Sequence, residues 1–368
     1  MIKLYTKRFL IATLGLLPLC ADAYDFKVDG FFFNITDSTS YEVEVTYSTS
    51  SKDEGGSYSG DIDLPSQVSY DGLTYSVSAI GDYAFYDCAI TSVSVPQSIT
   101  NIGEMAFYRC TKLTSIQLSH VTCISSYAFL DCTGLEHITI PSSITSMGEY
   151  VFYNCTGLES VEIEEGIDSI SPYTFRGCSG LKNVTLPNSL EGIGPCAFQN
   201  CSSIENISLP ENLKYIGYSS FVNCTSLTNI AIPNSVIYWG QTILSGCTAL
   251  RDFTIGEGVD YIPAYAFSKC ESLTNVQIPS HIKTIRSYAF QYCYGLENVS
   301  IPEGVEYIYD YAFRECKNLI GIFIPKSVKE IGAYTFYNCR SLAKAIILGS
   351  DNYIDFGAFE YCKCLKKV

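Results

Sequence analysis

Histidine and tryptophan are scarce in this 368-residue sequence, which contains three histidines and one tryptophan. His120, His137 and His281 stand in separate parts of the chain. The sequence also lacks a glycine-rich phosphate loop, a nucleophile elbow and a CxxC pair. Nothing in it therefore indicates catalysis, a cofactor or a metal site, and we expect the protein not to be an enzyme.

Positive charge is also scarce. The sequence has 23 basic and 38 acidic residues, which gives a net charge of −15. A surface of this sign repels nucleic-acid phosphates and anionic lipid headgroups, so we expect no nucleic-acid partner. Glu162, Glu164 and Glu165 form a tight group, but it does not repeat as a calcium-binding turn would. We interpret it as solvated surface charge.

Long apolar runs are missing except near the N-terminus. Three basic residues precede an apolar run from Phe9 to Leu19, and Ala21-Asp22-Ala23 follows as a small-x-small cleavage site. The run is too short to span a bilayer. Residues 1–23 are therefore predicted to be a signal peptide, and the protein to be secreted or located at the cell surface.

Cys20 offers an alternative end to this leader. It would be the lipidated cysteine of a lipoprotein, and this anchor would be the protein's only membrane attachment. The residue before it is Leu19, where a small residue is expected. The sequence leaves the lipidated and the freely secreted forms open.

Cysteine, in contrast, is plentiful and regularly spaced. Thirteen of the 17 cysteines each close a short aromatic motif, at steps of 22 residues twice and of 23 residues thereafter. Self-similarity at such a period indicates a solenoid, in which each coil buries its apolar face only against its neighbours. The thirteen are Cys88, Cys110, Cys132, Cys155, Cys178, Cys201, Cys224, Cys247, Cys270, Cys293, Cys316, Cys339 and Cys362.

Residues 296–316 show the pattern of one coil. Leu296, Val299 and Ile301 alternate with polar residues as in the strand of a leucine-rich repeat, so these apolar side chains should point inward. Pro302 then ends the strand, because proline cannot donate a ladder hydrogen bond. The chain turns back along the far side and places further Val, Ile and Phe side chains inward.

Equivalent residues of successive coils fall in register and predict buried ladders. The phenylalanine ladder includes Phe267, Phe290, Phe313 and Phe336. The cysteine ladder includes Cys270, Cys293, Cys316 and Cys339. Parallel neighbours do not readily adopt the torsion of a disulfide, and one cysteine per coil cannot supply four metal ligands. We therefore interpret these cysteines as small, buried, unpaired thiols.

One coil departs from the pattern. It carries Trp239 and Leu244 where the other coils carry Ile and Phe. A large residue replaces a medium one and a medium residue replaces a large one, as a core of constant volume requires. This exchange favours core packing for Trp239 over the alternative role of a ligand platform.

Residues 24–75 lack the repeat. A hairpin turning at Asp29-Gly30 and a strand over residues 41–47 suit an N-terminal β cap, which a solenoid needs because its first coil exposes an apolar face. Residues 76–368 then form about 13 coils and end within a repeat. The predicted fold is a β-rich leucine-rich-repeat solenoid, with a parallel sheet on one face and returns of short strand, 3-10 or helical structure on the other.

The repeat motif resembles a known family. Ile285 to Cys293, followed by Leu296 and Val299-Ser300-Ile301-Pro302, resembles the BspA-like bacterial surface antigens, whose leucine-rich repeat of the Treponema pallidum type shares this 23-residue period. The resemblance covers about residues 76–365, and residues 24–30 look like the start of such proteins. It implies an exported or surface-attached protein, and some members resemble adhesins that bind host matrix proteins or other bacteria.

Function is expected in outward-facing residues, because such a family defines a scaffold. Asn275 and Asn298 belong to a row of asparagines on the strand side, and Ile320, Phe323 and Ile346 are apolar residues at nearby solvent positions. Amides can orient a partner while apolar neighbours give desolvated area, so these five are the tentative binding residues. Alternatively, the asparagines form a polar ladder that blunts the sheet, and the apolar residues face a missing cap.

A second outward row consists of tyrosines two positions before the phenylalanines. Tyrosine offers rigid contact area with a polar tip, which suits protein or glycan contact. Stacked, half-buried tyrosines would equally stabilise the coils. The row comprises Tyr83, Tyr127, Tyr150, Tyr173, Tyr265, Tyr288, Tyr311 and Tyr334.

Taken together, these patterns predict an exported or cell-surface binding protein that is not catalytic and acts by adhesion or protein–protein interaction. Its partner would be a host matrix protein, a bacterial surface protein or a glycan. The alternative is a structural spacer, a repeat module without a dedicated ligand.

Overall fold

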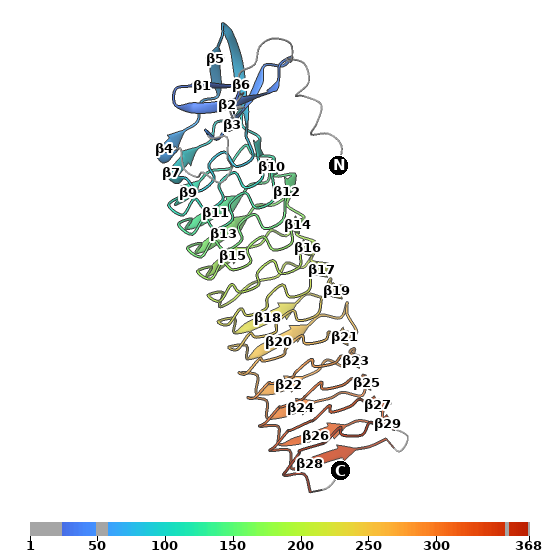
Figure 1. The fold of residues 1–368 in the computed structure, drawn as a ribbon. Helices are drawn as coiled ribbons and strands as arrows, with labels where there is room; N and C mark the ends of the chain where they lie inside the picture. The colour runs from blue at the N-terminus through green and yellow to red at the C-terminus, as the bar shows by residue number, and fades with distance from the viewer. Residues whose placement is uncertain (1–23, 49–57, 350–352, 367–368) are drawn as a thin grey trace, which may run out of the picture.

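The computed structural model describes residues 24–48, 58–349 and 353–366. It shows an elongated stack of coils that runs from the N-terminal strands to the C-terminal end (Figure 1). Most coils place a longer strand on one side, the strand side, and a two-residue strand on the other, the return side. The described residues contain no helix. The predicted solenoid is confirmed, and its returns consist of short strands and turns.

Strands of each side pair in parallel with the equivalent strands of neighbouring coils, and these pairings form several successive sheets rather than one continuous sheet. Those of the strand side are β4 (Ser59–Asp63), β7 (Ala89–Ser94), β9 (Ser115–Ile116), β11 (His137–Ile140), β13 (Ser160–Ile163), β15 (Asn183–Thr185), β18 (Asn229–Ile232), β20 (Asp252–Ile255), β22 (Asn275–Gln277), β24 (Asn298–Ser300), β26 (Gly321–Ile324) and β28 (Lys344–Ile347). Those of the return side are β8 (Asn101–Ile102), β10 (Cys123–Ile124), β12 (Ser146–Met147), β14 (Ser169–Ile170), β16 (Gly192–Ile193), β17 (Tyr215–Ile216), β19 (Tyr238–Trp239), β21 (Tyr261–Ile262), β23 (Thr284–Ile285), β25 (Tyr307–Ile308), β27 (Glu330–Ile331) and β29 (Tyr353–Ile354).

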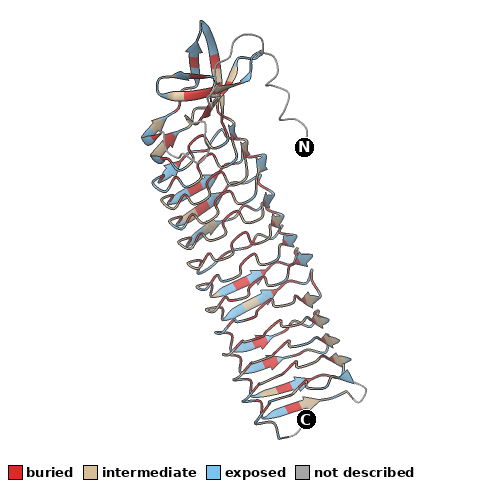
Figure 2. Ribbon diagram, in the orientation of Figure 1, coloured by how far each residue is buried: buried red, intermediate tan, exposed pale blue. Residues whose placement is uncertain are grey.

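Alternation along each strand decides which residues are buried. In β18, Ile230 and Ile232 are buried, whereas Asn229 and Ala231 are exposed. The parallel register places Asn229 beside Asp252 of β20. This period of two produces the striped strands in Figure 2. Outward residues at equal positions therefore form rows that cross the coils.

Proline ends the strands as the sequence predicts. β18 stops directly before Pro233, and the carbonyl of Pro233 accepts a hydrogen bond from the N–H of Val236 at 3.2 Å. The same turn recurs one coil after another, for example between Pro302 and Val305 at 3.2 Å. Because proline has no N–H to donate, the strand ladder closes here and the chain turns toward the return side.

Turns on the return side still bond to the next coil. The N–H of Phe290 donates to the carbonyl of Ala312 at 2.7 Å. Tyr288 and Tyr292 adopt a left-handed backbone, with φ of 62° and 61°, and the equivalent two positions are left-handed in the other coils. A left-handed residue other than glycine costs about 1–2 kcal/mol. The bonds and packing between coils must therefore outweigh this cost in every turn.

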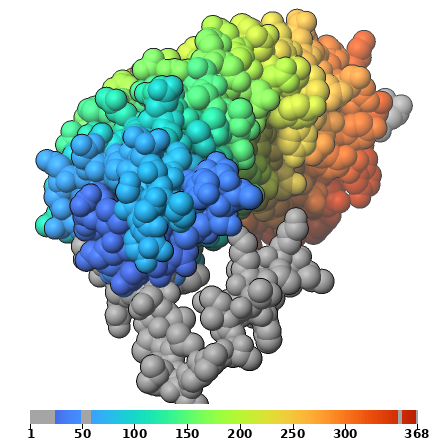
Figure 3. Space-filling model, turned by 90° about the horizontal axis from the view of Figure 1, so that it is seen from above, coloured from blue at the N-terminus to red at the C-terminus, as the bar shows by residue number. Residues whose placement is uncertain are grey.

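Five strands at the N-terminal end pack above the first coils: β1 (Phe26–Val28), β2 (Phe31–Asp37), β3 (Glu42–Thr46), β5 (Gln67–Tyr70) and β6 (Leu73–Ile80). The predicted hairpin is confirmed, because β1 and β2 pair antiparallel around Asp29 and Gly30, whose φ values are 49° and 89°. β4 pairs with β7 on the strand side, while β6 pairs with β8 on the return side. Seen from above, the N-terminal residues lie over the end of the stack (Figure 3).

Tyr58 joins this N-terminal unit to the first phenylalanine of the ladder. Its ring lies 4.9 Å from that of Phe85. Its hydroxyl accepts a hydrogen bond from the N–H of Phe32 at 3.1 Å and donates to the carbonyl of Thr46 at 2.9 Å. β6 spans the predicted boundary at residue 75, so the division into cap and solenoid stays a prediction. The predicted signal peptide, residues 1–23, lies outside the described residues.

Stacked phenylalanine rings run through the centre of the coils. From Phe267 to Phe359 the centroids of neighbouring rings are 5.1–5.4 Å apart, and the ring planes differ by 3–10°. Burying a phenylalanine side chain contributes about 1.5–3 kcal/mol. Since each ring contacts the rings before and after it, the core grows by addition of coils. The residues of this ladder with no exposed surface include Phe267, Phe290, Phe313 and Phe336.

Trp239 and Leu244 occupy the core of the exceptional coil. Trp239 is 1% exposed and Leu244 is fully buried. The indole Nε1 donates to the carbonyl of Tyr261 at 3.0 Å, and the indole packs edge-on against the ring of Phe267 at 6.4 Å. The interpretation of Trp239 as compensated core packing is confirmed.

Each cysteine of the ladder from Cys110 onward uses its thiol as a hydrogen-bond donor. The thiol of Cys293 donates to the carbonyl of Phe267 at 3.1 Å, and that of Cys316 to the carbonyl of Phe290 at 3.2 Å. Burial raises the pKa of Cys293 and of Cys247 to about 12. The thiol thus satisfies a carbonyl of the preceding coil while remaining small and uncharged. Cys270 and Cys339 donate in the same way, at 3.3 and 3.2 Å.

Replacing Phe290 by alanine should destabilise the protein by about 3–5 kcal/mol, because a cavity would open in the ladder. The loss should appear in hydrogen exchange as local opening across residues 267–313, since coils contact mainly their neighbours. The exposed Glu303, changed to alanine, is the matched control and should shift stability by less than about 0.5 kcal/mol. An unchanged exchange pattern in the Phe290 variant would contradict the ladder.

The ladder thiols should resist alkylation in the native protein. With a pKa of about 12, only roughly one molecule in ten thousand carries the Cys293 thiolate at pH 8. Iodoacetamide should therefore modify the exposed Cys364 while Cys293 stays unmodified. In denaturant without reductant, mass spectrometry should find nearly all ladder cysteines alkylated. Disulfide-linked neighbouring pairs in that experiment would refute the interpretation.

Candidate binding surfaces

Two surfaces of the stack are available to a ligand. The strand face is formed by the outward residues of the longer strands β7 to β28. The return face is formed by the outward residues of the short strands β8 to β29 and of the turn that follows each. Because every coil contributes the same positions, a departure from a row stands out on either face.

The predicted asparagines lie exposed on the strand face. Asn275 and Asn298 are in register on β22 and β24, and the Nδ2 amide of Asn298 donates to Oδ1 of Asn275 at 3.0 Å. Asn229 donates to Asn206 at 2.8 Å in the same row. Each such bond uses one donor of one amide and one lone pair of the other, so the remaining groups of the row face solvent.

The three predicted apolar residues lie at the C-terminal end of this face. Phe323 is 46% exposed on β26, between Ser300 of β24 and Ile346 of β28. Ile346 is half-buried. Ile320 is 53% exposed and directly precedes β26, in a different row. The structure thus brings Phe323 and Ile346 side by side.

The asparagine row does not continue into this apolar pair. Asn298 is in register with Gly321 and then with Lys344, one row away from Phe323. Asn275 and Asn298 therefore lie in one row, Phe323 and Ile346 lie in the adjoining row, and Ile320 lies outside both. The ladder residues Phe267 to Phe336 and Cys270 to Cys339 lie inside the coils, where a ligand cannot reach them.

A polar hollow of about 670 Å³ near the N-terminal end of the strand face was missed from the sequence. The register of β11, β13 and β15 places His137, Ser160 and Asn183 in one row. His137 Nδ1 lies 2.7 Å from Ser160 Oγ. Glu162, one row further, also lines the hollow. The signal in the sequence is the 23-residue spacing of positions 137, 160 and 183, which places these three side chains in one row.

On the return face, the tyrosine row forms stacked ladders. Tyr265, Tyr288 and Tyr311 stack with centroid distances of 4.5 and 4.8 Å and ring planes within 5° of parallel. The ladder is interrupted at three coils between Tyr173 and Tyr265. A second hollow, which the sequence reasoning also missed, lies beside this gap over the short strands β14 to β19.

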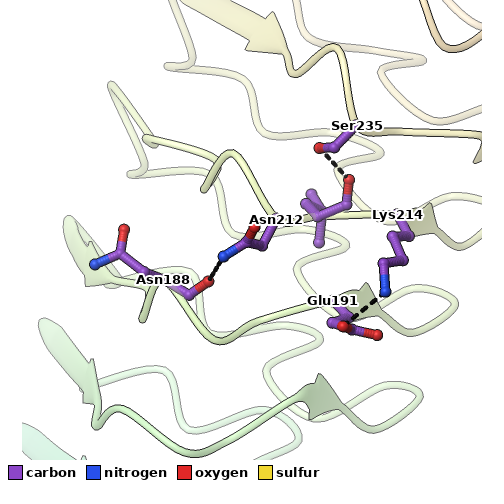
Figure 4. A network of polar contacts seen from close by, with 6 residues as sticks. Asn188, Glu191, Asn212, Lys214 and Ser235 are labelled. Atoms are coloured by element: carbon purple, nitrogen blue, oxygen red, sulfur yellow. Dashed lines mark hydrogen bonds and ion pairs between the residues drawn. The ribbon is translucent and has the colours of Figure 1, made fainter.

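Side chains also link consecutive coils along their edges. The Nδ2 amide of Asn212 donates to the carbonyl of Asn188 at 2.8 Å, and Lys214 pairs with Glu191 at 2.7 Å (Figure 4). The Lys214 and Glu191 side chains are about half exposed. An exposed pair of this kind contributes about 0–1 kcal/mol, so its main effect is to neutralise local charge.

Among the described residues, no group of three or more His, Cys, Asp or Glu side chains could hold a metal ion. Nor does the described part of the chain contain a helix that is long and apolar enough to cross a membrane. The chemistry that the outward rows offer is hydrogen bonding and apolar contact.

Known proteins share this architecture. A family model described as "BspA type Leucine rich repeat region" matches in six copies, over residues 78–191, 145–272 and 240–366. The chain is similar to a leucine-rich repeat protein from Bacteroides ovatus ATCC 8483, with 28% identity, coverage of 93% of this chain and 94% of that one, and a TM-score of 0.74. A leucine rich cell surface protein from Faecalibacterium prausnitzii A2-165 has 25% identity, covers 88% and 95%, and has a TM-score of 0.51. No curated protein matches.

Parallel strands stacked at a 23-residue repeat, with inward Leu, Ile and Val, define a leucine-rich-repeat solenoid. Within that class, the matched residues cover most of the chain, and the chain belongs to the BspA-type leucine-rich-repeat family. Such a solenoid is a repeat-based binding scaffold and is typically not catalytic.

Stacking in the tyrosine ladder should be measurable by paired alanine variants. Tyr288 has a ring neighbour on each side, whereas Tyr265 has one in the ladder. Both have a left-handed backbone, with φ of 62° and 57°, so alanine leaves the backbone cost in place. At about 0.5–1.5 kcal/mol per aromatic pair, Tyr288→Ala should lose about twice as much stacking energy as Tyr265→Ala in denaturant melts. Equal losses would show that stacking does not stabilise the coils.

Proposed function

We propose that this protein is an exported or cell-surface binding protein that recognises a protein partner through the C-terminal half of its strand face. The proposed site consists of Asn275, Asn298, Ile320, Phe323 and Ile346. Its role is adhesion or protein–protein interaction without catalysis. The relative from Faecalibacterium prausnitzii, described as a cell surface protein, supports the proposed location.

Exposure of Phe323 is the observation that carries the proposal. Its row is otherwise polar or small on the coils before it, with Gln277 and Ser300 at the equivalent positions. Phe323 is 46% exposed and lies outside the buried phenylalanine ladder, so it contributes little to core packing. It lies beside Ile346 of the next coil. An apolar centre beside orientable amides is the composition of a protein-binding hot spot.

One observation favours the alternative of a structural spacer. Asn298 donates to Asn275, and Asn229 donates to Asn206, so part of the asparagine row bonds within itself. Such hydrogen bonds link neighbouring coils and would stabilise the sheet even in a protein that binds no ligand. A spacer does not explain the exposed Phe323, and for this reason we favour the binding protein.

Partner capture followed by variant analysis tests the proposal. Residues 24–368, which omit only the predicted leader, are used to capture host matrix and bacterial surface proteins, and the affinity for each captured protein is then measured. Phe323→Ser and Asn298→Ala should each weaken binding by at least about tenfold. Tyr309→Ser is the matched control, because Tyr309 is 39% exposed on the return face of a neighbouring coil and should leave binding unchanged.

Retention of full affinity in both variants, with unchanged melting temperature, would place the binding site elsewhere. Absence of any captured protein would favour the spacer.

A further inference from the structure

Three successive coils lack the tyrosine of the return-face ladder. Cys196, Ser219 and Thr242 occupy its position, with the same left-handed backbone, at φ of 54°, 56° and 57°. Tyr173 and Tyr265 end the ladder on either side of this gap. A three-coil gap therefore removes rings from the middle of the aromatic row, which is otherwise interrupted between Tyr83 and Tyr127, at Met105.

Other tyrosines fill the surroundings of the gap. Tyr215, Tyr218 and Tyr238 are 50%, 45% and 49% exposed, and Tyr215 and Tyr238 are in register on β17 and β19. Tyr218 reaches across the intervening coil, so that its hydroxyl lies 3.0 Å from the hydroxyl of Tyr173. This hydrogen bond holds the Tyr218 side chain in one orientation, so that Tyr218 can form a rigid wall of a binding site.

A glycine forms the floor. Gly192 of β16 lies in register between Ser169 and Tyr215. A Cβ at Gly192 would meet only the Cβ of Ser169, at 3.8 Å, and its φ is not left-handed. In contrast, a Cβ at Gly217 would approach the backbone of Pro195 to 2.4 Å, so packing requires that glycine. Packing does not require Gly192, and its missing side chain leaves space.

The resulting hollow has a volume of about 350 Å³. Its lining combines Gly192 with the three exposed tyrosines. Ligand pockets for small molecules have volumes of about 300–1,000 Å³, whereas a stable protein interface needs about 800 Å² from each partner. The size therefore favours one or two small units of a ligand rather than a folded protein.

Little net charge lies beside the hollow. Glu191 and Lys214 precede β16 and β17 and pair with each other at 2.7 Å (Figure 4). At the equivalent position of the next coil stands Ile237, which is 57% exposed. Asp168, at the equivalent position before β14, adds one exposed carboxylate. A chain of net charge −15 thus presents an aromatic site with little net charge here. Such a site matches a neutral ligand better than an anion or a cation.

We propose that this hollow binds a sugar unit of a neutral oligosaccharide. A pyranose ring has an apolar face of C–H groups and an edge of hydroxyls. The tyrosine rings offer the matching apolar faces, and their phenol groups both donate and accept hydrogen bonds at the rim. The site lies on the return face, so it is separate from the protein-binding site proposed on the strand face and does not depend on it.

A proline-rich peptide is the other class of ligand that docks on exposed aromatic side chains. The small size of the glycine-floored hollow favours a ring-shaped neutral unit over an extended chain. Nor can a peptide add as a strand beside β16 or β17, because each pairs with short strands on both sides. Binding of a proline-rich peptide is therefore the alternative result that the experiment below can detect.

Binding is measured by saturation-transfer NMR and calorimetry with residues 24–368 and four neutral hexasaccharides: those of cellulose, starch, laminarin and β-mannan. Fluorescence of Trp239, the only tryptophan and the residue after Tyr238, gives an independent signal. At least one hexasaccharide should bind. Tyr215→Ala and Gly192→Tyr, the first removing a wall and the second filling the hollow, should each weaken its binding by at least about tenfold.

Tyr353→Ala is the matched control, because Tyr353 holds the same position on β29 with 60% exposure and does not line the hollow. It should leave the affinity unchanged. Melting temperatures confirm that each variant is folded, and Tyr238→Ala replaces any variant that is not. The proposal is overturned if no hexasaccharide binds, if folded Gly192→Tyr binds as tightly as the original protein, or if decaproline binds at the hollow in place of the sugars.

Discussion

Register between coils is the constraint on which the rest of this structure depends. No single coil can bury its own apolar face, so Phe290 is buried only because Phe267 and Phe313 lie at the same height in the coils on either side. The same register aligns the backbone, so that strands of neighbouring coils pair in parallel within several sheets. The two left-handed residues in every turn persist because these contacts between coils outweigh their cost.

Exceptions inside the core come with compensation. Pro263 has no N–H, whereas the equivalent Gly240 and Arg286 both donate to the preceding coil. The hydroxyl of Tyr261 instead donates to the carbonyl of Trp239 at 3.3 Å, and the Trp239 indole donates back to Tyr261. A buried carbonyl without a donor would cost about 1–3 kcal/mol, so the replacement partners preserve stability.

Much of this architecture is predictable from the period alone. Phe290 and Cys293 recur once per coil, so their inward direction follows from counting residues, and Asp29-Gly30 is a strong local signal for a hairpin. The left-handed backbone at Tyr288 is not predictable in this way, because tyrosine has no preference for it. The hollows are also not predictable from one repeat, because residues of at least three coils line each of them. The contact between Tyr218 and Tyr173, for example, spans 45 residues of sequence.

Exceptions on the surface differ from those in the core because nothing compensates them. Phe323 exposes aromatic surface that contributes no core packing, and Gly192 leaves space that no backbone contact requires. In a repeat protein the neighbouring coils show what a purely structural residue would be, here Ser300 for Phe323 and Ser169 for Gly192. A departure that stability does not explain, on a rigid face open to solvent, is therefore the strongest indication of binding that such a chain offers.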